Sequence, residues 1–206
     1  MCPYCMDYIR EQLYPTYKKL GKYIDIDYVP YGNAKMEYHP SNSSYTFSCQ
    51  HGPEECVGNK IQGCLRRKFP TAFPPSTSKD YHNTVQQLQI INCLMGTSIY
   101  PFGRLFYCLD EADLAPHILA PFYKRVLDCF AGNEGDQIMA EMGQATMELR
   151  PKHQYVPWVT VDGKHEPEAE KNLGQFLCKE KLKHVPECKG MSDEQFKTGR
   201  TWADTL

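Results

Sequence analysis

The spacing of apolar residues near the start of the chain predicts a helix over residues 3–20. Apolar side chains recur there every three or four positions, which places them on one helical face; they are Ile9, Leu13, Tyr17 and Leu20. Pro3 suits the first helical turn, where its missing N–H costs no hydrogen bond. Pro15 should kink this helix or break it near Tyr14, and Gly21 is suited to end it.

Alternation replaces helical spacing over residues 22–29, where apolar and acidic side chains follow in the order Ile24, Asp25, Ile26, Asp27 and Tyr28. This pattern is typical of a strand with one solvent-facing side. We expect residues 30–44 to form a loop and residues 45–49 to form a short second strand. A helix over residues 53–68 follows, because acidic residues occupy its first turn and basic residues its last.

The middle of the chain is predicted to be mostly helical. Residues 69–79 are rich in proline and should form a loop. From residue 80 to residue 149 the apolar spacing is that of helices almost throughout. We place helices near Tyr81–Met95, Pro116–Phe130 and Asp136–Leu149.

The last part of the chain returns to strand signals. Residues 158–161 read as a strand, and the Asp162-Gly163 pair that follows is a strong signal for a hairpin turn. A final helix is expected over residues 168–183. This order of elements predicts an α/β fold in which a long helical segment interrupts the strands.

The 206 residues correspond to one domain of ordinary size, which we place at residues 1–190, with a helical insertion at about 49–153. Residues 191–206 form a polar tail. Hydrophobic residues make up 41% of the chain, which argues against wholesale disorder. The net charge of −2 gives no basic excess for nucleic-acid binding. No run of about 18 apolar residues is present to span a membrane.

Cysteine is the most informative residue type, with ten in the chain. Their even number and mostly wide spacing suit an oxidising compartment, and the sequon Asn42-Ser43-Ser44 agrees with glycosylation of Asn42 there. One pairing is predicted from position: Cys178–Cys188 closes a short loop after the last helix. The other pairings stay open. The eight cysteines expected in disulfides are Cys49, Cys56, Cys64, Cys93, Cys108, Cys129, Cys178 and Cys188.

The remaining two cysteines form a Cys-x-x-Cys motif, Cys2-Pro3-Tyr4-Cys5, at the predicted start of the first helix. Unpaired backbone N–H groups and the positive end of the helix dipole stabilise a thiolate at Cys2. Cys5, one turn later, can then resolve a mixed disulfide. We therefore interpret the pair as redox-active. The alternatives are half of a zinc site, for which no second half exists in the sequence, and two structural cysteines with partners elsewhere.

Val156-Pro157 precedes the predicted strand at residues 158–161. Thioredoxin-like folds carry a cis-proline at a similar place, facing the dithiol, and the preceding residue offers backbone groups to an extended substrate. We therefore expect a cis Val156–Pro157 bond and substrate binding at these two residues. The alternative is an ordinary proline at the entry to a strand.

Three cysteines, a histidine and two acidic residues lie within residues 49–64. A metal site made of Cys49, His51 and Cys56 is conceivable, but we favour disulfide halves at a strand-to-helix corner and predict no metal. The stretch matches C-Q-H-G-x-x-E-C-x-x-N-x-x-x-x-C, the signature of the gamma-interferon-inducible lysosomal thiol reductase (GILT) family. The resemblance covers nearly the whole chain and extends to Cys2-Pro3-Tyr4-Cys5, Pro30-Tyr31-Gly32-Asn33-Ala34 and Tyr155-Val156-Pro157-Trp158-Val159.

This resemblance implies a thioredoxin-like fold with a helical, disulfide-stapled insertion. It also implies reduction of protein disulfides at acidic pH, in endosomes, in lysosomes or outside the cell. Cys2 resembles the attacking cysteine and Cys5 the resolving one, whereas the signature is treated as scaffold. Family members carry a strand immediately before their Cys-x-x-Cys, and here only Met1 precedes it. We therefore expect N-terminal residues, including that strand and a signal peptide, to be missing, and the 206 residues alone to fold poorly.

The resulting prediction is a lysosomal, endosomal or secreted protein-disulfide reductase that needs no metal or organic cofactor. Its substrates would be disulfide-bonded, partly unfolded proteins that thread extended chain past Val156. Two alternatives use the same sequence features. A secretory-pathway oxidase or isomerase would differ only in redox potential, and a secreted binding protein would keep Cys2–Cys5 as a structural disulfide.

Overall fold

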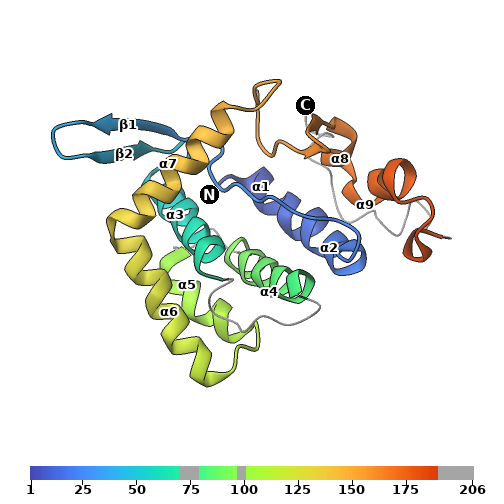
Figure 1. Ribbon diagram of the computed structural model, residues 1–206, viewed down its shortest axis with the longest axis horizontal. Coiled ribbons are helices and arrows are strands. Elements are labelled where there is room, and N and C mark those ends of the chain that lie inside the picture. The colour runs from blue at the N-terminus through green and yellow to red at the C-terminus, as the bar shows by residue number, and fades with distance from the viewer. Residues whose placement is uncertain (70–78, 97–100, 190–206) are drawn as a thin grey trace.

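The structure is a computed structural model that describes residues 1–69, 79–96 and 101–189. Its described part consists of helices and two short antiparallel hairpins (Figure 1). The predicted mixture of helix and strand is confirmed, whereas the sheet of a thioredoxin-like domain is not among the described elements and stays a prediction. No described helix combines the length and apolar character needed to cross a bilayer. Residues 70–78 of the predicted loop and the predicted tail at 191–206 lie outside the described residues.

A single helical rod runs from residue 3 to residue 20, as predicted. It consists of α1 (Pro3–Tyr8), the π-helical segment η1 (Ile9–Leu13) and α2 (Tyr14–Leu20). Pro15 does not break the rod. The turn before it widens instead, and the Tyr14 N–H donates to the Ile9 carbonyl five residues back. The rod ends at Gly21, whose N–H donates to the Tyr17 carbonyl at 2.8 Å.

The strand predicted at residues 22–29 is wrong, because these residues join no ladder in the described part of the chain. The alternation itself is real: the apolar positions are half-buried and the aspartates are exposed. The apolar side chains pack against a helical core cluster rather than against a neighbouring strand; they are Ile24, Ile26 and Tyr28. An extended segment lying on helices therefore produces the same sequence pattern as a strand.

A projecting hairpin follows, made of β1 (Lys35–His39) and β2 (Ser44–Ser48) paired antiparallel. Strand β2 agrees with the predicted strand at 45–49 to within one residue. Strand β1 and the first residue of β2 lie inside the predicted loop at 30–44, so that prediction is wrong over six residues. Asn42 of the predicted sequon is exposed in the turn between the two strands.

The segment in which we predicted an insertion is mostly helical in its described part and is crosslinked by disulfides. Helix α3 has the predicted bounds, and three further predicted helices lie within three residues of α4, α6 and α7, whereas α5 was not predicted separately. The Cys64–Cys129 bond joins α3 to α6, and the Cys93–Cys108 bond joins α4 to α5. The bounds are α3 (Pro53–Lys68), α4 (Lys79–Leu94), α5 (Pro101–Asp110), α6 (Pro116–Ala131) and α7 (Asn133–Met147).

The predicted turn near the C-terminus is confirmed. Strands β3 (Thr160–Val161) and β4 (Lys164–His165) form a hairpin, with φ of 51° at Asp162 and 76° at Gly163. Positive φ at both central residues is what a two-residue turn of this kind requires, and the Asp-Gly pair tolerates it. The strand itself is two residues long, shorter than predicted.

The single helix predicted over residues 168–183 is wrong, because the chain breaks at Asn172. There the backbone is extended, and the Asn172 side chain accepts a hydrogen bond from the Gln175 N–H, which starts a new helix. The segments are α8 (Pro167–Lys171), α9 (Leu173–Phe176), the π-helical η3 (Leu177–Lys181) and the 3₁₀ segment η4 (Pro186–Cys188). The Cys178–Cys188 bond that position predicted joins the last two.

The N-terminal rod lies between the helical insertion and the C-terminal helices (Figure 1). One face packs on α4 and the other on α8 and α9, so both halves of the chain hold the rod in place. The buried members of the first contact are Ile9, Tyr17, Leu88, Ile91 and Met95. Those of the second include Tyr8, Leu20, Ala169 and Leu173.

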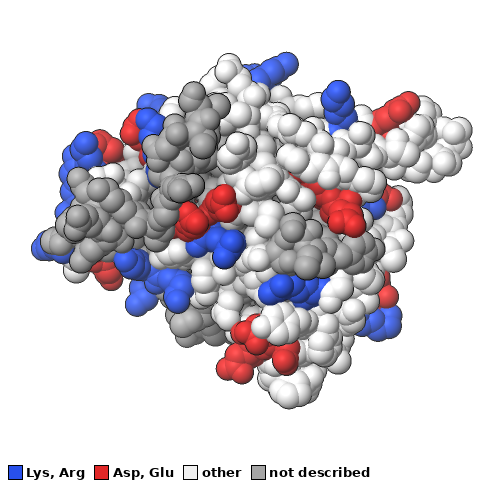
Figure 2. Space-filling view, turned by 180° about the vertical axis from the view of Figure 1, so that it is seen from behind, with Lys and Arg blue, Asp and Glu red and all other residues white. Residues whose placement is uncertain are grey.

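Several charged side chains on the described part of the surface form ion pairs. Figure 2 shows acidic and basic side chains interspersed over the described part of the rear face. Three ion pairs link α3 to α7: Lys60–Asp136, Arg67–Glu141 and Lys68–Glu134. This distribution agrees with the small net charge of the chain.

Helix α7 approaches the loop at Tyr31 closely at Gly143. A Cβ atom at this glycine would lie 2.8 Å from two ring carbons of Tyr31. Tyr31 belongs to the main core cluster, which is formed mostly by buried apolar residues of helices α3 to α7. We expect Gly143→Ala to lower the free energy of unfolding by about 1–3 kcal/mol, although alanine normally favours a helix interior. Denaturant unfolding measures this change. In a Tyr31→Leu background the same substitution should cost clearly less, and an equal cost in both backgrounds would contradict the assignment.

Candidate active site

The two cysteines of the N-terminal motif occupy the start of α1. Cys2 is the N-cap residue and is only 7% exposed, and Cys5 lies one turn later, partly buried. Both are free thiols, whereas the other eight cysteines form four disulfides, Cys49–Cys56, Cys64–Cys129, Cys93–Cys108 and Cys178–Cys188. The predicted separation into one dithiol and eight bridged cysteines is therefore what the structure contains.

The surroundings make the two thiols unequal. A hydrogen bond from the Cys5 thiol is the main cause that lowers the pKa of Cys2 to about 6, against the effect of burial. Backbone N–H groups of Cys5 and Tyr4 and the charge of His51 act in the same direction. The pKa of Cys5 is raised by that same hydrogen bond, then by burial and by the negative charges of Cys2 and Glu55. Cys2 is thus suited to attack as a thiolate, and Cys5 stays protonated beside it.

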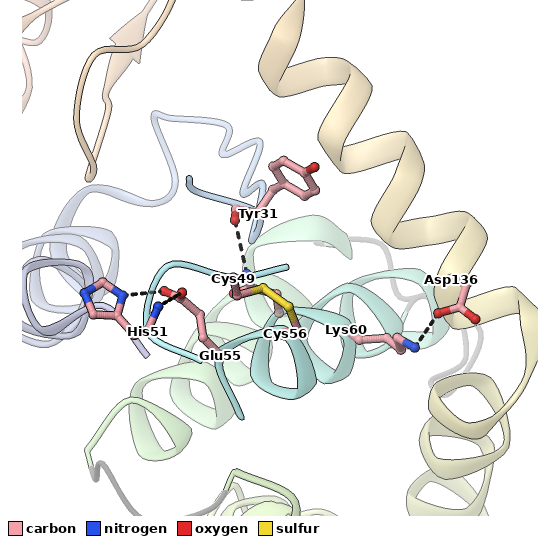
Figure 3. The surroundings of a disulfide bond; sticks show 8 residues. Tyr31, Cys49, His51, Glu55, Cys56, Lys60 and Asp136 are labelled. Carbon is pink, nitrogen blue, oxygen red and sulfur yellow. Dashed lines mark hydrogen bonds and ion pairs between the residues drawn. A yellow bond between two sulfur atoms is a disulfide. The ribbon is translucent and has the colours of Figure 1, made fainter. Parts of the chain in front are cut away.

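The signature segment folds into a corner that holds a histidine–glutamate pair (Figure 3). Gly52 has a φ of 88°, and its N–H donates to the Cys49 carbonyl at 3.2 Å. The Cys49–Cys56 disulfide closes this turn onto the start of α3. The Glu55 carboxylate then accepts from the His51 N–H at 2.8 Å and pairs with His51 Nδ1 at 3.0 Å.

This geometry excludes the metal site that we considered from the sequence. Cys49 and Cys56 are joined to each other, so neither offers a thiolate ligand beside His51. Within the described ranges, no group of three or more potential ligands comes together. The reading as disulfide halves at a strand-to-helix corner is confirmed for Cys49 and Cys56.

Further signature residues form hydrogen bonds with residues 30–34, the loop that follows the N-terminal rod. Asn59 Nδ2 donates to the Tyr31 carbonyl at 3.1 Å; Figure 3 labels Tyr31, where this dashed line ends. Asn33 Nδ2 donates to the Gln50 side-chain carbonyl at 2.8 Å. Two amide side chains therefore fix the position of residues 30–34 against the corner. Sequence reasoning missed these roles, although the matched loop motif was a signal for them.

The same loop contacts the predicted substrate-binding segment. His153 Nε2 lies 3.2 Å from Asn33 Oδ1, and a Cβ atom at Gly32 would lie 3.8 Å from Val156 Cγ1. The Val156–Pro157 bond is cis, as expected. Residues 30–34 thus connect the signature to Val156 and Pro157, two motifs separated by about a hundred positions in sequence.

A buried carboxylate holds the residues around the cis bond. Glu170 is 2% exposed and accepts from the Tyr155 hydroxyl at 2.8 Å and from the Val159 N–H at 3.0 Å. It also pairs with His165 Nε2 at 2.9 Å, and the His165 ring stacks on Trp158 at 3.4 Å. Burial, followed by the hydrogen bond to Glu170, raises the pKa of Tyr155 to about 12, so its hydroxyl remains a donor. Nothing in the local sequence predicted this network, because its members are joined only by folding.

Comparison with known proteins agrees with the motifs. Residues 1–112 match the family model described as gamma interferon inducible lysosomal thiol reductase. The protein of that name from Carassius auratus is 31% identical over 183 residues, which cover 86% of this chain and 64% of that protein. A lysosomal thiol reductase-like protein of Anopheles gambiae is 30% identical over 198 residues, covering 91% of this chain and 76% of the other.

The protein of the same name from Mus musculus is 30% identical over 166 residues, covering 80% of this chain. The chain spans only 64% of the Carassius auratus protein and 58% of the Mus musculus protein. The family match includes the dithiol, the signature and the loop that connects the signature to the segment at Val156. This chain belongs to the gamma-interferon-inducible lysosomal thiol reductase family.

Proposed function

We propose that this protein is a thiol reductase that reduces disulfide bonds of proteins through Cys2 and Cys5. The observation that carries the proposal is the division between the two thiols: the pKa of Cys2 is lowered to about 6, while that of Cys5 is raised. The relatives named lysosomal thiol reductases support the same class of reaction. The chemistry takes place between sulfur atoms and requires no metal or organic cofactor.

In the proposed reaction, the Cys2 thiolate attacks one sulfur of the substrate disulfide. The substrate S–S bond breaks, a Cys2–substrate disulfide forms, and the leaving thiolate takes up a proton. Cys2 then carries no negative charge and accepts no hydrogen bond from Cys5, so two of the causes that raise the pKa of Cys5 disappear. Cys5 loses its proton to solvent and attacks Cys2. The substrate leaves with two thiols, and the enzyme keeps a Cys2–Cys5 disulfide that a small thiol must reduce.

The substrates we propose are partly unfolded proteins that offer an extended segment. Val156 and Pro157 would bind that segment through backbone groups, in a thioredoxin-like arrangement with the dithiol. The network around Glu170 supports this role, because it fixes the backbone on both sides of the cis bond. The sites come from both ends of the chain, which supports a single domain over residues 1–190.

We further propose an acidic lysosomal or endosomal compartment, or the extracellular space, as the place of action. Four disulfides require oxidising conditions during folding, and the exposed Asn42 would accept a glycan on the same route. A thiol whose pKa is about 6 also remains partly ionised in acid.

Single-turnover reduction of insulin disulfides by the pre-reduced protein tests this function at pH 7 and pH 5. With a pKa of about 6, the thiolate fraction of Cys2 falls roughly tenfold between these pH values. A free thiol of pKa about 8.5 loses roughly a hundredfold over the same range. We expect the rate to fall roughly tenfold and the protein to reduce insulin at both pH values. A hundredfold fall, or no reduction by the fully reduced protein, would contradict the proposal.

A further inference from the structure

The His51–Glu55 pair has no part in the exchange of sulfur bonds described above, yet the fold holds it rigidly. Both hydrogen bonds of the pair run between His51 and one carboxylate, and Glu55 is 9% exposed in the first turn of α3. The Cys49–Cys56 bond and the turn at Gly52 restrain its backbone.

The pair faces the dithiol. Glu55 and Gln62 lie two helical turns apart on α3 and are therefore on one face. Gln62 accepts from the Tyr28 hydroxyl and donates to the Met1 sulfur at 3.5 Å, so this face lies against the residues around the dithiol. Figure 3 shows the His51 ring directed away from the disulfide, toward the pale blue N-terminal part of the chain.

Within this arrangement the two ends of the pair act on different sulfurs. The imidazole of His51 interacts electrostatically with Cys2, and the carboxylate of Glu55 interacts with Cys5. A positive charge favours the Cys2 thiolate, while a negative charge disfavours a thiolate at Cys5. The orientation of the pair therefore matches the order in which the two cysteines must act.

We propose that His51 and Glu55 are positioning residues that assign the attacking role to Cys2 and the resolving role to Cys5. This inference rests on the proposed function and extends it to the signature segment, which the sequence suggested only as scaffold. A positive charge at His51 favours the Cys2 thiolate over the thiol, which lowers the pKa of Cys2.

Other ionisable groups face the same sulfurs and must be included in any titration. The Cys5 thiol, from α1, acts on Cys2, and the Glu55 carboxylate, from α3, acts on Cys5. The Tyr28 phenol interacts with Cys5, and burial followed by that interaction raises its pKa, so it stays neutral. The amino group of Met1 acts on Cys5 in the direction opposite to Glu55.

Alkylation of the reduced protein by iodoacetamide, with no substrate present, tests the assignment. Tandem mass spectrometry assigns the label to Cys2 or Cys5. His51→Gln should slow labelling of Cys2 at pH 5 by roughly threefold to tenfold. It should change the rate little at pH 8, because a thiol whose pKa is about 6 is almost fully ionised there. Glu55→Gln should raise labelling of Cys5 relative to Cys2. His39→Gln is the matched control. His39 lies in the hairpin, where its ring is hydrogen-bonded to Thr46, and this change should alter neither rate.

An unchanged Cys2 rate at pH 5 in His51→Gln would overturn the proposal, as would equal slowing at pH 5 and pH 8. If His51→Gln lowers the melting temperature, slower labelling could reflect a loss of folded structure. His51→Lys then tests the role of the charge, because lysine keeps a positive charge at all of these pH values. Labelling of Cys2 at pH 5 should then be at least as fast as in the unaltered protein, and slow labelling would overturn the proposal. Since no substrate is used, failure of insulin reduction alone counts against the proposed function and not against this assignment.

Discussion

Cys2→Ser is expected to reduce insulin reduction to the level of a buffer blank and to form no covalent adduct with substrate. A serine hydroxyl at this position is not ionised at neutral pH and cannot replace the thiolate whose pKa is lowered to about 6. Turnover is measured by insulin precipitation, and adducts are measured on gels run without reductant.

Cys5→Ser should give a different result from the same assays. The Cys2 thiolate can still attack, but no thiol remains to resolve the mixed disulfide. Covalent substrate–enzyme adducts should accumulate and should disappear when excess thiol is added. A double variant, Cys2→Ser with Cys5→Ser, is the matched control and should trap nothing. If Cys2→Ser traps substrate while Cys5→Ser does not, the roles are reversed.

The largest expected effect on stability is that of removing the Cys64–Cys129 disulfide. This bond closes a separation of 65 residues between α3 and α6, and both of its cysteines are buried in the main core cluster. The loop-entropy estimate for Cys64→Ala with Cys129→Ala is a loss of about 4 kcal/mol in the free energy of unfolding. Guanidinium unfolding of the non-reduced protein measures this loss.

Removal of the Cys93–Cys108 bond is the appropriate comparison, because it too joins two helices of the insertion. Its separation is 15 residues, for which the same estimate gives about 3 kcal/mol. We expect the pair Cys93→Ala and Cys108→Ala to be the less damaging one. A larger loss there than at Cys64–Cys129 would show that packing, not loop length, determines the contribution of these bonds.

The helices could be predicted from sequence because their signals are local. Helix α3 carries acidic residues in its first turn and basic residues in its last, and its bounds are those predicted. The failures arise where a local pattern has two physical causes. Alternation over residues 22–29 reflects packing on helices, whereas the similar alternation within β1 (Lys35–His39) reflects a true strand, and sequence alone does not separate them.

The candidate active site, too, could be predicted from sequence only where its signals are local. The spacing of Cys2 and Cys5 and their place at a helix start are local properties, so the dithiol could be predicted. The charge that acts on Cys2 comes from His51, and the carboxylate that holds Val159 comes from Glu170. These contacts join distant parts of the chain and depend on the complete fold, which no local pattern describes.

The order of the bridged cysteines along the chain bears on how the protein is made. Its closed loops are either separate or nested: Cys93–Cys108 lies within Cys64–Cys129, and the bonds Cys49–Cys56 and Cys178–Cys188 lie outside both. No loop interlaces with another, so in the oxidising compartment that we propose each bond can close without crossing a bond already formed. Three of the four bonds join cysteines that are consecutive among the bridged ones. The fourth, Cys64–Cys129, encloses the Cys93–Cys108 bond, so Cys64 must remain unpaired while Cys93 and Cys108 are synthesised.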